Sequence, residues 1–226
     1  RLQMFVLRAK VKLVDASEEL VLIGGATPEA MPGVPWQRND RDGGAWLRVP
    51  DAGALQRWLW AGPLANAMPF WQQQALKLPP APAALWRWSE IIAGLPQVLE
   101  ATKEQFVPQM INFELVGGVN FRKGCYPGQE IVARSQYLGK LKRRMLLARV
   151  DIADPAAAAP GTEVFSDADP GQPSGMIVNA ELGPEGHVDC LVEIKMDAVG
   201  SPVHLGSAGG PLLQFAELPY PLEAST

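Results

Sequence analysis

The chain has 226 residues, of which 47% are hydrophobic and 19% are charged, and its formal net charge is −4. This length and apolar content are sufficient for a buried core and favour two domains. No run approaches the ~18 uninterrupted apolar residues of a membrane span, and basic residues interrupt the start where a signal peptide needs its hydrophobic region. We therefore expect a soluble, cytoplasmic protein with no membrane partner.

The first eighty residues alternate between β-rich and helical patterns. The chain begins with Arg1 rather than methionine, and we expect a further N-terminal portion outside this numbering. Asp51 is predicted to cap a helix that ends at Gly62, because Leu55, Trp58 and Leu59 share a helical face. Shorter elements are predicted as strands over residues 11–14, 20–23 and 45–49 and as helical turns over residues 27–30 and 72–76.

A stronger helix is predicted over residues 85–95, where apolar side chains recur at helical spacing before Gly94 and Pro96. Trp88 lies on the apolar face and is expected in the core. Trp86 lies on the other face, where it is a candidate for stacking on the flat ring of a ligand, although an exposed or loop-covered aromatic side chain explains it equally well. A second short helix is predicted over residues 109–116.

The most informative stretch is Arg-Lys-Gly-Cys-Tyr-Pro-Gly-Gln-Glu, residues 122–130. Pro127 suits the first turn of a helix, and a helix is predicted over residues 129–138. Cys125 would then precede a helix N-terminus, where free N–H groups and Lys123 favour the nucleophilic thiolate. The alternative is a small hydrophobic side chain in a tight turn, for which Gly124 and Gly128 supply backbone freedom.

The cysteine count limits the metal chemistry. Cys125 and Cys190 are 65 positions apart, which gives neither a disulfide framework nor a CxxC site. With only His187 and His204 besides, we expect no stably bound zinc or iron–sulfur cluster. Cys190 is predicted in the core, His187 at a turn and His204 within a strand.

Positive charge gathers around this stretch. Residues 119–149 contain eight basic residues and one acid, so their net charge is +7 and that of the remaining chain is −11. A cationic surface would attract a polycarboxylate, a nucleic acid or an acidic protein. The basic residues at positions 140–144 are explained equally well as protection of a strand edge.

From residue 144 onward the chain reads as short β-rich runs separated by turn residues, and we predict a small C-terminal β-barrel. The runs cover residues 145–150, 163–166, 175–180, 187–196 and 203–205.

The segment from Phe106 to Arg144, with its run FRKGCYPGQEIVAR, resembles the signature of the YgfZ family, folate-binding proteins related to the T protein (aminomethyltransferase) of the glycine cleavage system. The family pattern is Lys-Gly-Cys-Tyr, any residue, Gly-Gln-Glu, then Val-Ala-Arg and a glycine followed by Lys-Arg. Every fixed position is met. The Ala-Gly-Leu-Pro at residues 93–96 and the Leu-Pro-Tyr at residues 218–220 resemble the family more weakly.

The resemblance implies an α+β fold: an aminomethyltransferase-like folate-binding domain over residues 1–143, incomplete at its N-terminus, followed by the β-barrel domain over residues 144–226. It implies tetrahydrofolate or a derivative as cofactor. The catalytic residues that it implies are Cys125 and Lys123. The other motif positions are Gly124, Tyr126, Gly128, Gln129, Glu130 and Arg134. The ligand-binding residues that it implies are Trp86, Asn112 and Arg143.

Two functions follow from the resemblance. The first is an accessory protein for iron–sulfur cluster assembly or repair, whose partners are folate and assembly or client proteins, with tRNA an indirect partner at most. The second is a tetrahydrofolate-dependent aminomethyltransferase acting on a small amine. The glycine-cleavage relatives carry an Arg and a Glu before the Ala-Gly, where this chain has Glu90 and Ile92, which argues against conventional aminomethyl transfer. Direct nucleic-acid binding ranks third, because aromatic residues do not interleave with the basic cluster.

Overall fold

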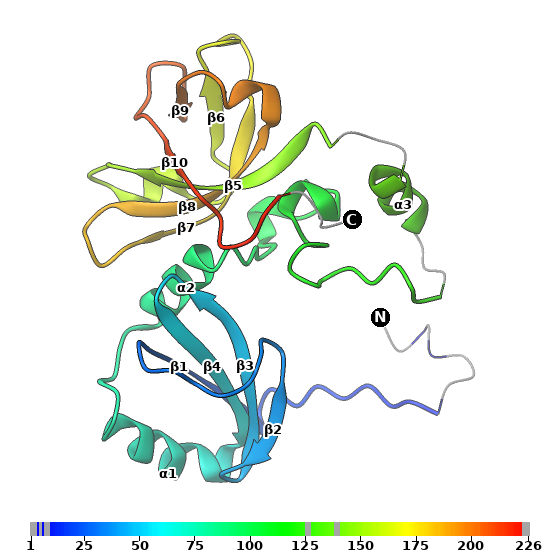
Figure 1. Cartoon of the computed structure of the whole chain (residues 1–226), viewed down its shortest axis with the longest axis vertical. Coiled ribbons are helices and arrows are strands. Elements are labelled where there is room, and N and C mark those ends of the chain that lie inside the picture. The colour runs from blue at the N-terminus through cyan, green and yellow to red at the C-terminus, as the bar shows by residue number, and fades with distance from the viewer. Residues whose placement is uncertain (1–3, 5, 7–9, 125–127, 138–140, 223–226) are drawn as a thin grey trace. The chain divides into compact units, whose positions relative to one another are not determined.

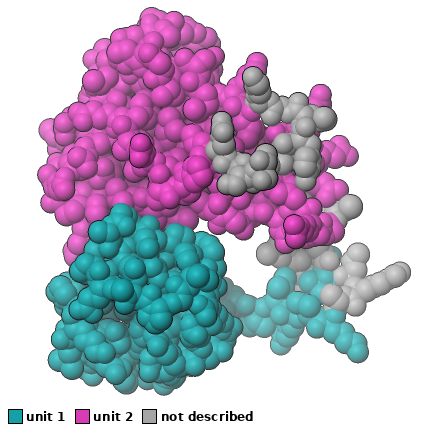
Figure 2. Space-filling model, viewed as in Figure 1, with its two compact units in different colours: residues 1–81 teal, residues 82–226 magenta. Residues whose placement is uncertain are grey.

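The computed structural model describes the chain except residues 1–3, 5, 7–9, 125–127, 138–140 and 223–226. The predicted α+β class is confirmed, because helices accompany two antiparallel sheets (Figure 1). The chain divides into two compact units, unit 1 (Arg1–Ala81) and unit 2 (Pro82–Thr226), which Figure 2 colours separately. The domain boundary near residue 143 that the family resemblance implies stays a prediction.

Unit 1 is a four-stranded antiparallel sheet with one helix, in the strand order β1-β4-β3-β2. Its elements are β1 (Leu20–Thr27), β2 (Arg38–Arg41), β3 (Gly44–Ala52), β4 (Leu55–Pro63) and α1 (Leu64–Ala75). The strands predicted over residues 20–23 and 45–49 are confirmed as parts of β1 and β3.

Aromatic rings fill the core of unit 1. Trp60 is fully buried and stacks on Phe70 of α1 with ring centroids 4.4 Å apart, and Trp46 lies 4.5 Å from Trp58. The rings lie over glycines: a Cβ added to Gly25 would come within 2.1 Å of Trp58, and one added to Gly62 within 2.3 Å of Trp60. Glycine is needed in these strands because the indoles occupy the space of a side chain.

The predicted helix after Asp51 is wrong. Its residues form the β3–β4 hairpin, which turns at Gly53, where φ is +59°. Trp58 and Trp60 are two residues apart and therefore point to the same side of β4. This two-residue repeat of a strand determines the structure here, although Leu55, Trp58 and Leu59 also fit the spacing of a helix. Residues 11–14, which are described, do not form the predicted strand, and residues 27–30 do not form the predicted helical turn. The turn predicted at residues 72–76 is the end of the longer helix α1.

Unit 2 combines short helices with a six-stranded antiparallel half-barrel in the order β10-β5-β8-β7-β6-β9. The helices are α2 (Ala83–Ile92), η2 (Glu100–Thr102), η3 (Pro108–Ile111), α3 (Gln129–Tyr137), η4 (Pro155–Ala158) and η5 (Met196–Ala198). The strands are β5 (Arg143–Val150), β6 (Glu163–Ser166), β7 (Gly175–Leu182), β8 (Val188–Lys195), β9 (Val203–Leu205) and β10 (Gln214–Ala216).

The five β-rich runs predicted after residue 144 are confirmed as β5 to β9, and β10 was not foreseen. Their inward side chains form an apolar cluster that includes Cys190, as predicted. A second cluster, on Ile91 and Ile111, joins α2 and η3 to β5, β7 and β8. The half-barrel therefore has apolar contacts on both faces of its central strands.

The predicted helix over residues 109–116 is only the 3-10 turn η3. Asn112 follows it in the left-handed conformation, with φ at +57°, and this stops the helix. The following residues form turns up to Gly118. The helices predicted over residues 85–95 and 129–138 are confirmed as α2 and α3.

Candidate functional site

The candidate site comprises the two described segments on either side of residues 125–127. We call the preceding segment, residues 108–124, the signature arm, and the following segment is helix α3. Cys125 and Tyr126 lie outside the described residues. Before them, Lys123 and Gly124 are exposed, and after them Gly128 is exposed with φ at +83°. A positive φ explains why the family pattern has glycine at this position.

Helix α3 begins four residues after Cys125, and its described side chains range from exposed to buried. Glu130 and Arg134 face solvent, and Gln129 is half-buried. Val132 is buried, whereas Ile131 is 60% exposed. In the described part of the helix, Val132 therefore faces inward and Glu130, Ile131 and Arg134 face outward.

The inner side of the signature arm is a buried polar network. Gln109 Nε2 donates to the carbonyl of Val132 at 2.7 Å, which joins the arm to α3. Asn112 Nδ2 donates to the carbonyl of Met145 at 2.8 Å, which joins the arm to β5. Both side chains are fully buried. Asn112, predicted from the resemblance as a ligand-binding residue, is thus engaged inside the protein.

Arg144 lies at the centre of this network, and sequence reasoning missed it. Its Nη1 donates to the carbonyl of Gln109 at 3.0 Å and contacts Asn112 Oδ1 at 3.5 Å, and the same nitrogen pairs with the Glu114 carboxylate. Its Nη2 donates to the carbonyl of Leu222 at 3.3 Å. The Arg144 side chain is only 11% exposed, so it is neither a surface charge nor protection of an open strand edge.

Two more arginines of the cationic segment are engaged internally. Arg143, another predicted ligand-binding residue, pairs through two nitrogens with Glu193, which is 2% exposed. Hydrogen bonding to Glu193 raises the pKa of Arg143 above its ordinary value. Arg149 contacts Asp189 at 3.5 Å and Glu185 at 3.8 Å. The exposed cationic surface is therefore smaller than the predicted charge of +7, and its described members are Arg122, Lys123, Arg134 and Lys142.

The two tryptophans of α2 have different surroundings. Trp88 Nε1 donates to Asp189 Oδ2 at 2.7 Å, and His187 Nε2 lies 3.3 Å from the same oxygen. This contact fixes α2 on the β7–β8 hairpin. Trp86 is half-buried on the same helix.

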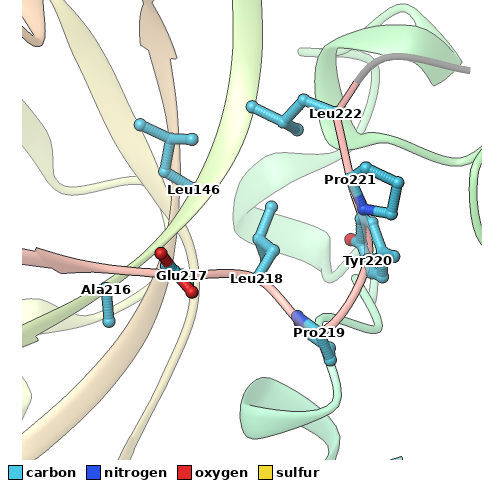
Figure 3. Close-up of a pocket in the computed structure, with 8 residues that line it drawn as sticks. All are labelled: Leu146, Ala216, Glu217, Leu218, Pro219, Tyr220, Pro221 and Leu222. Carbon is cyan, nitrogen blue, oxygen red and sulfur yellow. The ribbon is translucent and has the colours of Figure 1, made fainter.

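An open apolar hollow of about 500 Å³ in unit 2 is lined by Leu146 and residues 216–222. Figure 3 shows Leu146, Leu218 and Leu222 around it. Tyr220 lines it too and donates its hydroxyl to the carbonyl of Gly94 at 2.7 Å. Burial raises the pKa of Tyr220 to about 12. None of the described candidate residues from the sequence lines this hollow.

Cys190 is completely buried, and burial raises the pKa of its thiol far above the ordinary range. Its Sγ donates to the carbonyl of Ala148 at 3.4 Å. Among the described residues, no group of three or more His, Cys, Asp or Glu side chains is placed to hold a metal ion. In the same residues, no helix has the length and apolar character to cross a bilayer.

Comparison with known proteins gives three informative relatives, each called tRNA-modifying protein YgfZ. The chain is 42% identical to the protein of Colwellia psychrerythraea over 82 residues, 36% of this chain. It is 45% identical to that of Vibrio atlanticus over 62 residues and 48% identical to that of Klebsiella pneumoniae over 60 residues, 27% and 26% of this chain. The matched regions span 25%, 19% and 18% of these relatives.

No protein-family model matches the chain. The three pairwise matches are short, but identities of 42–48% over 60 or more residues far exceed chance similarity. They confirm the resemblance to the YgfZ family that the sequence signature indicated.

Proposed function

We propose that the chain is part of a YgfZ-type folate-binding accessory protein that supports the assembly or repair of iron–sulfur clusters, and that it serves tRNA modification through cluster-dependent enzymes. The single observation that carries the proposal is the similarity to three proteins named for tRNA modification. The complete signature motif, at residues 123–134, is consistent with it.

The chemistry proposed for the site is that of a cysteine thiolate. Cys125 precedes α3 in the chain, and Arg122 and Lys123 are exposed just before it. A helix N-terminus and neighbouring cations both lower the pKa of a thiol. A thiolate at this position would ligate or attack an electrophilic centre presented by a partner, and the described residues on either side of it, Gly124 and Gly128, are exposed.

The proposed ligand is tetrahydrofolate or a derivative. Trp86 is assigned the stacking role because it is the aromatic side chain among the three candidates. Asn112 and Arg143 bond to Met145 and Glu193 inside the protein. We expect Trp86→Ala to weaken tetrahydrofolate binding about ten-fold, the equivalent of one aromatic stacking contact. Arg143→Met is the control and should leave the affinity unchanged in fluorescence or calorimetric titration. If Arg143→Met weakened tetrahydrofolate binding and Trp86→Ala did not, Trp86 would be excluded as the stacking residue.

The function is tested by complementation. In a bacterium without its own YgfZ protein, this protein should restore the modified nucleosides measured in tRNA by mass spectrometry. Cys125→Ala should abolish the rescue while leaving folate affinity within a few-fold, and the matched Cys190→Ala control should retain it. Full rescue by Cys125→Ala would remove this thiol from the mechanism.

The transferase alternative makes a distinct prediction. An aminomethyltransferase would transfer a formaldehyde-level carbon from an aminomethyl donor to tetrahydrofolate and release the amine, in repeated turnovers. We expect no turnover above the uncatalysed rate. Robust turnover that Cys125→Ala leaves intact would replace the accessory role with the enzymatic one.

A further inference from the structure

We infer that unit 1 pairs with a second copy of the chain by strand exchange, in which residues 10–14 of each copy add to the free edge of β1 in the other. The inference concerns assembly and goes beyond the proposed function. It joins two features of unit 1, an open strand edge and a strand-like segment that lies outside the sheet.

The first feature is the outer edge of β1. Among the described strands β1 pairs only with β4, so one side of its backbone has no strand beside it. Its eight residues include no charge and no proline, and Leu20 and Leu22 are 50% and 70% exposed. The opposite edge of the same sheet is β2, whose four residues are all exposed and three of them charged. Charge protects an edge strand from pairing, so β2 is protected and β1 is not.

The second feature is the segment at residues 10–14, Lys-Val-Lys-Leu-Val, which we call the donor segment. Lysine and apolar residues alternate in it, as they do in a strand with one face on a protein surface. The described structure gives it no strand or helix, and Val11, Leu13 and Val14 are 56%, 44% and 64% exposed. The donor segment therefore has the pattern of a strand but no strand partner in the described chain.

Charge favours pairing of the two features. Lys10 and Lys12 are exposed, and so are Asp15, Glu18 and Glu19 in the turn that leads into β1. The donor segment thus carries a charge of +2 beside a turn that carries −3. A donor segment placed along β1 brings its lysines within the ~10 Å over which such charges attract at moderate ionic strength.

Apolar surface continues from β1 onto helix α1. Leu64, Met68 and Trp71 follow one another at helical spacing and are 61%, 63% and 41% exposed. This stripe starts beside β1, because the Leu64 N–H donates to the Glu19 carbonyl at 2.9 Å. Pairing at β1 would therefore add the burial of apolar side chains to the backbone hydrogen bonds of the new strand.

The turn between the two features indicates that the partner is another copy. Ser17 donates to Asp15 Oδ1 through its N–H at 3.0 Å and its hydroxyl at 2.6 Å, and the Ala16 carbonyl accepts from the N–H groups of Glu19 and Leu20 at 3.0 Å. With the turn in this conformation, the donor segment of the same chain does not pair with β1. A second copy has no such tether, and the exchange of identical elements gives a closed two-fold pair.

The experiment measures the molar mass of the full chain by light scattering over a dilution series from about 100 μM to about 1 μM. We expect wild type to dimerise within this range. Leu13→Lys in the donor segment and Leu22→Lys on β1 should each weaken dimerisation at least about ten-fold, because each places a charge within the paired strands. Val34→Lys is the matched control: the residue is 67% exposed and belongs to neither feature, so the dissociation constant should stay unchanged.

A mixture of the two leucine variants tests whether the donor segment is the occupant. In a mixed pair, the intact donor segment of the Leu22→Lys copy meets the intact edge of the Leu13→Lys copy, so the mixture should associate at concentrations where neither variant does alone. Both leucines are exposed, and unchanged tryptophan emission would show that both variants keep the fold of unit 1.

Three results would overturn the inference: a wild type that is monomeric over the whole series, dimers that Leu13→Lys leaves intact, or a mixture that associates no better than its components. Dimers insensitive to Leu13→Lys would pair through β1 alone or through another surface. Because these measurements involve neither folate nor tRNA, a failed complementation test leaves the inference unaffected.

Discussion

We expect Asn112 to stabilise the signature arm in two ways, through its left-handed backbone conformation and through the hydrogen bond of its side chain. The residue is fully buried, adopts φ of +57°, and donates to the Met145 carbonyl at 2.8 Å. In Asn112→Ala the carbonyl loses its donor, at a cost of about 1–3 kcal/mol. Alanine in the left-handed region adds about 1–2 kcal/mol. Together these predict a loss of about 2–5 kcal/mol in the free energy of unfolding of unit 2.

The matched variant Asn112→Gly separates the two contributions. Glycine loses the same hydrogen bond but accepts the left-handed conformation, although its flexible unfolded state returns about 0.4–1 kcal/mol of the difference. We therefore expect the glycine variant to be about 0.5–1 kcal/mol more stable than the alanine variant. Urea denaturation followed by pulsed labelling of Cys190 measures this in unit 2. An alanine variant as stable as wild type, or more stable than the glycine variant, would refute the reasoning.

Two further predictions concern the half-barrel. Because burial raises the pKa of Cys190, the folded state keeps its proton where the unfolded chain releases it, so the stability of unit 2 should fall by about 1.4 kcal/mol per pH unit above ~8.5. Urea denaturation between pH 8.5 and 10 should show this slope in wild type and not in Cys190→Ala. This pH range lies below the one in which ionisation of Tyr220 adds its own effect. A slope that the substitution leaves unchanged would contradict the assignment to Cys190. Gly175→Ala would place a Cβ 2.0 Å from the Glu193 carbonyl oxygen, and we expect urea denaturation to show a loss of about 3 kcal/mol in the free energy of unfolding. Gly200→Ala is the control: its Cβ would have no atom within 4 Å, and the loss should be less than about 1 kcal/mol. An equal loss in both variants would count against the steric argument.

The sequence predicted strands best where short apolar runs are flanked by turn residues, as in β7 and β8. It failed at β4, where Leu55, Trp58 and Leu59 also fit helical spacing. What decides the structure there is the fit of Trp58 and Trp60 against glycines on neighbouring strands, which is a tertiary contact that no local pattern contains.

Helix α1 shows the same override. Pro69 lies inside it and argues against a helix when the sequence is considered alone. The helix persists because Ala67 and Phe70 are buried against the tryptophans of the sheet. Burial of these side chains offsets the hydrogen bond that proline removes.

The candidate site was predictable only in part. The signature motif is visible in the sequence, and the similarity to YgfZ proteins confirms that resemblance. The roles of the individual residues depend on partners distant in the chain: Arg144 meets Glu114 thirty positions away, and Arg143 meets Glu193 fifty positions away. A count of charges cannot distinguish a surface lysine from an arginine that is neutralised internally.

The aromatic core of unit 1 has a practical consequence for spectroscopy. Five of the seven tryptophans belong to unit 1, and the other two are Trp86 and Trp88 in α2. Intrinsic emission will therefore be dominated by the ring cluster around Trp60, whereas the sulfur of Cys190 reports separately on the second half of the chain. One denaturant titration can thus follow the unfolding of unit 1 by tryptophan emission and that of unit 2 by Cys190 labelling. It would show whether the two units unfold at the same denaturant concentration.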